Sequence, residues 1–82
     1  MKATEIVTAD RIETSPECLA IYIGEGRFQI PWSECSSLLA EASESERLNA
    51  ELSPGGYGIH WPAIDEDLSI GGLLGRLLPD GS

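Results

Sequence analysis

The stretch Cys18–Ile30, "CLAIYIGEGRFQI", sets the fold that the rest of the chain must fit. Its first six residues form an almost continuous apolar run, which predicts a central strand. The glycines that follow supply the positive φ angles of a tight hairpin at Gly24-Glu25-Gly26. The next four residues, Arg27–Ile30, alternate polar and apolar side chains as a returning strand does. The stretch therefore predicts two antiparallel strands joined by a tight turn.

The segment before this hairpin has a mixed pattern. From Thr4 to Glu13, the apolar residues Ile6, Val7 and Ile12 stand among threonines and charged residues. Such a pattern is typical of an edge strand or a half-buried strand. The first thirty residues are therefore expected to form a meander of three strands.

Two helical segments are expected after the meander. Ser33 can cap a helix whose apolar side chains share one face at the i, i+3, i+4, i+7 spacing. That face consists of Cys35, Leu38, Leu39 and Ala42. Ser43 and Glu46 stand in the register of a capping box, which predicts a second short helix over residues 44–50 with Leu48 turned inward.

The last third of the chain predicts one more strand and one more helix. Pro54-Gly55 is typical of a type II turn, and Tyr57–Trp61 after it reads as a strand. Ser69 can cap an amphipathic helix, and Pro79 ends it. The apolar face of this helix consists of Ile70, Leu73, Leu74, Leu77 and Leu78.

The predicted fold is one α+β domain over residues 1–82. We expect a small, mainly antiparallel sheet that consists of the three-stranded N-terminal meander and a C-terminal strand. Two or three short helices are expected on one face of it. A chain of 82 residues can build only one small core.

The acidic composition restricts the partners. Fourteen acidic residues against five basic ones give a formal net charge of −9. Nucleic acids and anionic membranes are repelled by such a charge, so we expect no nucleic-acid or membrane binding by this chain and a basic protein as partner. No stretch reaches the roughly eighteen apolar residues of a membrane span, and the first ten residues lack the apolar core of a signal peptide. We therefore expect a cytoplasmic protein.

The two cysteines, Cys18 and Cys35, stand in neither a Cys-x-x-Cys pair nor a metal-knuckle spacing. In a reducing cytosol they are expected to be buried thiols that act as small hydrophobic side chains.

His60, Asp65, Glu66 and Asp67 are the first candidates for chemistry, since an imidazole and carboxylates can bind a metal ion or transfer protons. Their spacing argues against it, because a strand that ends at Pro62 must turn back before His60 can meet Asp65. No second histidine completes a zinc ligand set. A metal-binding or metal-dependent hydrolase domain that uses these four residues is the alternative hypothesis.

The preferred interpretation of the same residues is structural. The three acids precede the predicted helix, where carboxylates can accept hydrogen bonds from free backbone N–H groups and complement the helix dipole. His60 is then a hydrogen-bonded structural residue. No serine stands in a Gly-x-Ser-x-Gly elbow, so we expect neither enzymatic activity nor a cofactor.

Aromatic side chains suggest an interaction surface. Trp32, Tyr57 and Trp61 are rigid anchors of the kind that dominate interfaces, and a rim of carboxylates would steer a basic partner toward them. The alternative is that both tryptophans fill the core. The leucine-rich C-terminal helix also predicts a homodimer or docking to another chain. The predicted partner-binding residues are His60, Trp61, Asp65, Glu66 and Asp67.

The stretch "GYGIHWPAIDEDLSIGGLL", Gly56–Leu74, resembles the signature of a family of small bacterial proteins known as domain of unknown function 2442. Further matches upstream extend the resemblance over residues 15–75; they are Gly26-Arg27, Pro31, Leu39-x-x-Ala42, Arg47-x-Asn49 and Glu51-Leu52. The resemblance implies a small α+β domain. It assigns no activity to the matched residues.

Genes of this family often lie beside another short gene, in an arrangement that resembles a toxin–antitoxin pair with this family as the antitoxin. We therefore expect a non-enzymatic, antitoxin-like interaction module whose partner is a small basic protein encoded by an adjacent gene.

Overall fold

The computed structural model describes residues 7–75. The predicted N-terminal meander is confirmed, since β1 (Arg11–Thr14), β2 (Cys18–Ile23) and β3 (Gly26–Pro31) form an antiparallel sheet in the order β1-β2-β3. Ile23 lies opposite Gly26, so the hairpin turn holds only two residues. Its first residue, Gly24, has φ +57°, which favours glycine.

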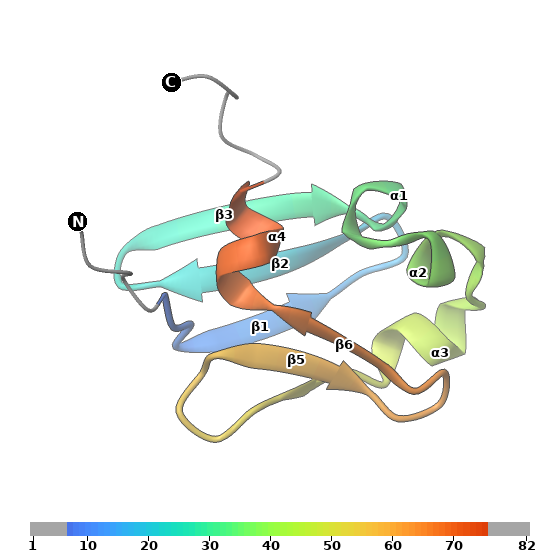
Figure 1. Cartoon of the computed structure of the whole chain (residues 1–82). Helices are drawn as coiled ribbons and strands as arrows, with labels where there is room; N and C mark the ends of the chain where they lie inside the picture. Colours follow the sequence, from blue (N-terminus) through green and yellow to red (C-terminus); the bar gives the residue numbers. More distant parts are fainter. Residues whose placement is uncertain (1–6, 76–82) are drawn as a thin grey trace.

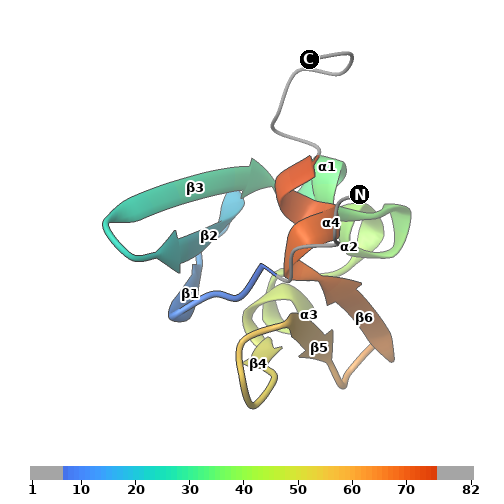
Figure 2. The same ribbon diagram turned by 60° about the vertical axis from the view of Figure 1, so that its left-hand side comes forward.

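A second antiparallel sheet follows, where the sequence predicted only one further strand. It consists of β4 (Glu51–Leu52), β5 (Gly58–Trp61) and β6 (Glu66–Ser69), in the order β4-β5-β6. Figures 1 and 2 show it separate from the sheet of β1–β3. The α+β class and the antiparallel pairing are confirmed, but the C-terminal strand belongs to this second sheet.

The turn between β5 and β6 corrects the role predicted for the acidic triplet. Asp65 has φ +54°, a conformation that aspartate tolerates better than most residues, and the chain reverses there. Glu66 and Asp67 consequently lie in a strand and do not cap a helix. The cap of α4 (Ile70–Gly75) is Ser69 as predicted, since the N–H of Gly72 donates to its Oγ over 2.9 Å.

The single helix predicted after a cap at Ser33 is wrong, because two short helices replace it. They are α1 (Trp32–Cys35) and α2 (Ser37–Glu41), and Ser36 between them is extended. The Oγ of Ser36 accepts a hydrogen bond from the N–H of Leu39 over 3.1 Å, so Ser36, and not Ser33, supplies the cap. Cys35 and Leu39 of the predicted apolar face are buried, whereas Leu38 is about half exposed.

The capping box of α3 (Glu44–Leu48) is confirmed. The N–H of Glu46 donates to the Ser43 hydroxyl, and the N–H of Ser43 donates to the Glu46 carboxylate. The inward orientation predicted for Leu48 is wrong, since this side chain is about half exposed. Arg47 joins α3 to the end of α2, because its guanidinium donates to the carbonyls of Leu39 and Ala40, each over 2.9 Å.

The hydrophobic core lies between the two sheets and the helices. It contains Leu19, Ile21, Ile30, Trp32, Cys35, Leu39, Ile59, Trp61, Ile70 and Leu73. The two indole rings meet edge to face, with centroids 6.3 Å apart and an angle of 83° between their planes. In Figure 1 the helices α1, α2 and α3 gather at the end where β3 and β5 finish. No helix in the described part of the chain is both long and apolar enough to span a membrane.

The apolar face of α4 is covered by this core as far as the structure describes it. Ile70 and Leu73 are buried and Leu74 is partly buried, whereas Leu77 and Leu78 lie outside the described residues. The homodimer therefore stays a prediction.

Of the two cysteines, Cys35 is buried and Cys18 only half buried beside the hydroxyl of Ser15, which is 3.6 Å from its Sγ.

Gly56 joins the two sheets. Its carbonyl accepts a hydrogen bond of 2.8 Å from the N–H of Ala9, just before β1, and its φ is +77°. A Cβ at this position would run into the backbone of Ala9.

We expect Gly56→Ala to lower the free energy of unfolding by at least about 2 kcal/mol, because the new methyl group clashes and the backbone is strained. The matched control is Gly71→Ala in α4, where a Cβ meets nothing within 4 Å. It should leave the stability unchanged or raise it by up to about 1 kcal/mol. Urea denaturation followed by tryptophan fluorescence measures both, and equal stabilities of the two variants would contradict this assignment.

Candidate interaction surface

The outward face of the β4–β6 sheet carries His60, Asp67 and Ser69, polar residues of the stretch Gly56–Leu74. Side chains alternate along a strand, and in β5 Ile59 and Trp61 are buried while Gly58 and His60 are half-buried. The register places Asp67 opposite His60 and Ser69 opposite Gly58. These residues share the face of the sheet that points away from the core.

His60 and Asp67 form a direct contact. The Nδ1 atom of His60 lies 2.8 Å from Oδ1 of Asp67, and the two side chains are 39% and 75% exposed. An ionised carboxylate only accepts hydrogen bonds, so Nδ1 is the donor. The strand does turn back after Pro62, against expectation, and it brings Asp67, rather than Asp65, to His60.

The other two acids do not join this pair. Asp65 lies in the exposed turn, and Glu66 lies opposite the buried Trp61 on the other face of the strand. Among residues 7–75, no group of three or more histidine, cysteine, aspartate or glutamate side chains is placed to hold a metal ion. Of the four residues in the metal hypothesis, the structure therefore brings together only His60 and Asp67.

Trp61 does not lie on the predicted interaction surface. It is completely buried, and its Nε1 donates to the carbonyl of Arg47 over 3.1 Å. Trp32 is buried as well, with its Nε1 donating to the carbonyl of Ser15 over 2.9 Å. Both tryptophans fill the core, which confirms the alternative interpretation of these two residues. Tyr57 is exposed.

Sequence reasoning missed the position of Glu51 beside His60 and the groove on the β4–β6 sheet. Glu51 of β4 lies opposite His60 on the side away from Asp67, so two carboxylates flank the histidine across three strands. No local signal identifies Glu51, because a strand of two residues has no readable period.

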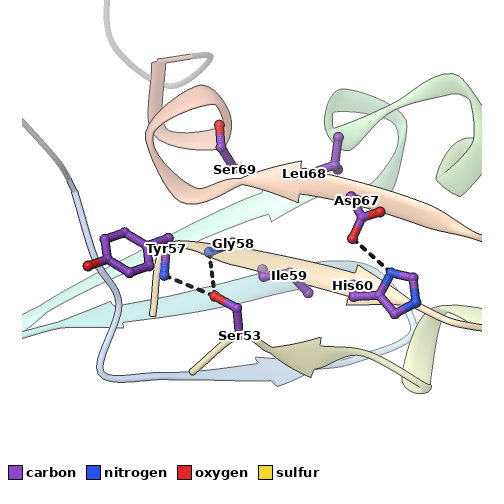
Figure 3. A pocket seen from close by; sticks show the side chains of 8 residues that line it. All are labelled: Ser53, Tyr57, Gly58, Ile59, His60, Asp67, Leu68 and Ser69. Atoms are coloured by element: carbon purple, nitrogen blue, oxygen red, sulfur yellow. Dashed lines mark hydrogen bonds and ion pairs between the residues drawn. The ribbon is translucent and has the colours of Figure 1, made fainter. Parts of the chain in front are cut away.

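An open groove of about 330 Å³ runs along the same face (Figure 3). Tyr57 lies at one end of it and the His60–Asp67 pair at the other, with Gly58 between them. The hydroxyl of Ser53 accepts hydrogen bonds from the N–H groups of Tyr57 and Gly58, over 3.1 and 3.0 Å. The remaining lining residues are Ile59, Leu68 and Ser69.

The outward face of the β1–β3 sheet has a different charge pattern. The guanidinium of Arg11 lies 3.8 Å from the centroid of the Tyr22 ring and donates to the Glu13 carboxylate. The Tyr22 hydroxyl also donates to Glu13, and Nε of Arg27 donates to that hydroxyl, each over 3.0 Å. The hydrogen bond from Arg11, and after it the one from Tyr22, lowers the pKa of the Glu13 carboxyl. The guanidinium groups of Arg11 and Arg27 are therefore already engaged by side chains of the same sheet.

One prediction compares the buried Trp61 with the exposed Tyr57. Trp61→Ala should lower the free energy of unfolding by about 3–5 kcal/mol, because it empties part of the core. Tyr57→Ala should change it by no more than about 0.5 kcal/mol, because this ring is on the surface. Denaturation curves followed by circular dichroism test the pair, and similar losses for both would place Tyr57 in the core as well.

A second prediction concerns pH. Because the pKa of Glu13 is lowered in the folded protein, its ion pair stabilises the fold above the ordinary glutamate pKa and is lost as the pH falls through the folded value. Arg11→Gln should raise the pKa of Glu13 toward its ordinary value, and Tyr22→Phe should raise it less. An NMR titration of the Glu13 carboxyl carbon measures these shifts. An unchanged pKa in Arg11→Gln would contradict the assignment.

Comparison with known proteins supports the family resemblance. Residues 29–77, more than half of the chain, match the family model described as "Protein of unknown function (DUF2442)". No curated protein matches the chain. Among solved structures, a protein of unknown function from Rhodospirillum rubrum is similar, with 27% sequence identity and a TM-score of 0.72 over 83% of this chain and 84% of that chain. This chain therefore belongs to the family of proteins of unknown function DUF2442.

Proposed function

We propose that this protein is a non-enzymatic module that binds a basic protein through the outward face of β4–β6. The distribution of charge carries this proposal. The chain has a net charge of −9, and the arginines of the described residues, Arg11, Arg27 and Arg47, are engaged with their own neighbours. Glu51, Asp65 and Asp67 are exposed and make no ion pair with an arginine among residues 7–75. Such a face attracts a basic surface over distances of about a Debye length.

The arrangement favours binding over metal chemistry. A catalytic zinc site needs three protein ligands and an open position, and His60 with Asp67 supplies two. The metal-dependent hydrolase hypothesis consequently lacks a third donor in the described part of the chain. A polar strand face with one aromatic side chain is, in contrast, a composition found at protein interfaces.

The partner we propose is the basic product of an adjacent gene, which the module would hold in an antitoxin-like manner. This part of the proposal follows from the family resemblance and from the acidic charge. Masking a basic surface by an acidic one requires no catalysis.

Co-expression with the adjacent gene tests the proposal. The two proteins should co-purify at low salt and separate as the ionic strength rises, since exposed charge pairs are screened. If the neighbour is toxic to cells, this protein should relieve the toxicity. Absence of both co-purification and relief would overturn the proposal.

Charge-neutral variants locate the surface. The double variant Glu51→Gln, Asp67→Asn should weaken the complex by about 0.5–2 kcal/mol, as expected for the loss of two exposed ion pairs. The matched control is Glu17→Gln, Glu25→Gln, which makes the same change in net charge at exposed positions of the other sheet's loops. Equal weakening by both variants would mean that the affinity depends on the net charge of the protein and not on the position of the charges on this face.

A further inference from the structure

We infer that the groove between Tyr57 and the His60–Asp67 pair receives an arginine side chain of the basic partner. The inference rests on the proposed function and specifies its central contact. Eight residues line the groove, among them Tyr57, Gly58, His60 and Asp67.

The shape of the groove suits a long, thin side chain. Gly58 has no side chain and leaves the floor open between Tyr57 and His60 (Figure 3). A Cβ there would lie 3.0 Å from the carbonyl oxygen of Leu68, so the strands approach closely beneath it. From Tyr57 to His60 the chain rises about 10 Å, so only a long side chain, such as that of arginine or lysine, can contact the groups at both ends of the groove.

The charges in the groove select a cation. Oδ1 of Asp67 accepts from His60, while Oδ2 has no hydrogen-bond partner among residues 7–75. Glu51, on the other side of His60, adds a second carboxylate to the same face. An anionic ligand is repelled by these groups, and a second copy of this face would oppose carboxylate to carboxylate.

An arginine fits better than a lysine for two reasons. Its planar guanidinium can donate two hydrogen bonds to one carboxylate, which an ammonium group does not match. Its stem and its flat head also pack on an aromatic ring, and the Tyr57 ring at the end of the groove is 53% exposed.

The groove is organised before the partner arrives. The Tyr57 ring lies directly over Gly55, where a Cβ would be only 2.7 Å from its Cε2 atom. The backbone beside the ring is held by the hydroxyl of Ser53, and the Asp67 carboxylate is oriented by His60. Side chains that are already fixed lose less conformational entropy on binding.

The experiment uses a capped tripeptide, acetyl-Gly-Arg-Gly-amide, as the probe, with acetyl-Gly-Lys-Gly-amide for comparison. Each is titrated at low salt into the ¹⁵N-labelled protein, and chemical shifts are followed by NMR. We expect the largest shifts at the amides of Tyr57, Gly58, His60, Asp67 and Ser69. The arginine peptide should bind at least about twofold more tightly than the lysine peptide.

Variants separate the contributions of the Asp67 carboxylate and the Tyr57 ring to peptide binding. Asp67→Asn and Tyr57→Ala should each weaken binding of the arginine peptide by about threefold or more, whereas Tyr57→Phe, which keeps the ring, should leave it nearly unchanged. Glu25→Gln, a matched loss of one charge in the β2–β3 turn, is the control and should have no local effect. Unchanged amide shifts far from the groove verify that each variant is folded.

Shifts centred on the acidic residues of α2 and α3, equal binding of both peptides, or no effect of Asp67→Asn would each overturn the inference. The outcomes also distinguish the two proposals. If the adjacent gene product still binds the double variant Tyr57→Ala, Asp67→Asn as tightly as it binds the wild type, the groove assignment fails and the proposed function stands. If the arginine peptide binds as described but the gene product does not, the proposed function fails and the preference of the groove for arginine stands.

Discussion

The antiparallel pairing of β5 with β6 decides which side chains the protein keeps inside and which it shows to a partner. Because side chains alternate along a strand, the register that buries Trp61 also turns His60 outward and places Asp67 opposite it. A slip of one residue would move the indole into water and the imidazole into the core. The burial of Trp61 therefore fixes the composition of the outward face, although Trp61 itself takes no part in that face.

Arg47 connects this strand pair to the helices. Its carbonyl accepts the hydrogen bond of Trp61, and its guanidinium satisfies two carbonyls at the end of α2 and lies 5.7 Å from the centroid of the Trp32 ring. The use of the Arg47 side chain in these contacts affects the distribution of charge on the surface. Glu41, Glu44 and Glu51 are exposed and make no ion pair with an arginine among residues 7–75, whereas Arg11 and Arg27 on the outward face of β1–β3 contact Glu13 and Tyr22.

Local interactions explain what the sequence determined by itself. The hairpin at Gly24, the capping box of Ser43 and Glu46, and the cap at Ser69 each involve residues within four positions of one another. Their geometry follows from backbone conformation and hydrogen bonding inside one turn, so the residue types predict it. The α+β class followed from these elements, and the net charge of the chain followed from composition.

Contacts between segments that are far apart in the sequence decided the features that the sequence did not predict. Glu66 and Asp67 are compatible with the start of a helix and with a strand, and only pairing with β5 selected the strand. The helix expected after Ser33 is interrupted at Ser36, and packing against the core buries Cys35 and Leu39 of its predicted apolar face but not Leu38. The sequence determined the β2–β3 hairpin, the caps at Ser43 and Ser69 and the negative charge. Tertiary structure decided the burial of Trp61, the meeting of His60 with Asp67 and the position of Glu51, because strand register depends on side chains that are far apart along the chain.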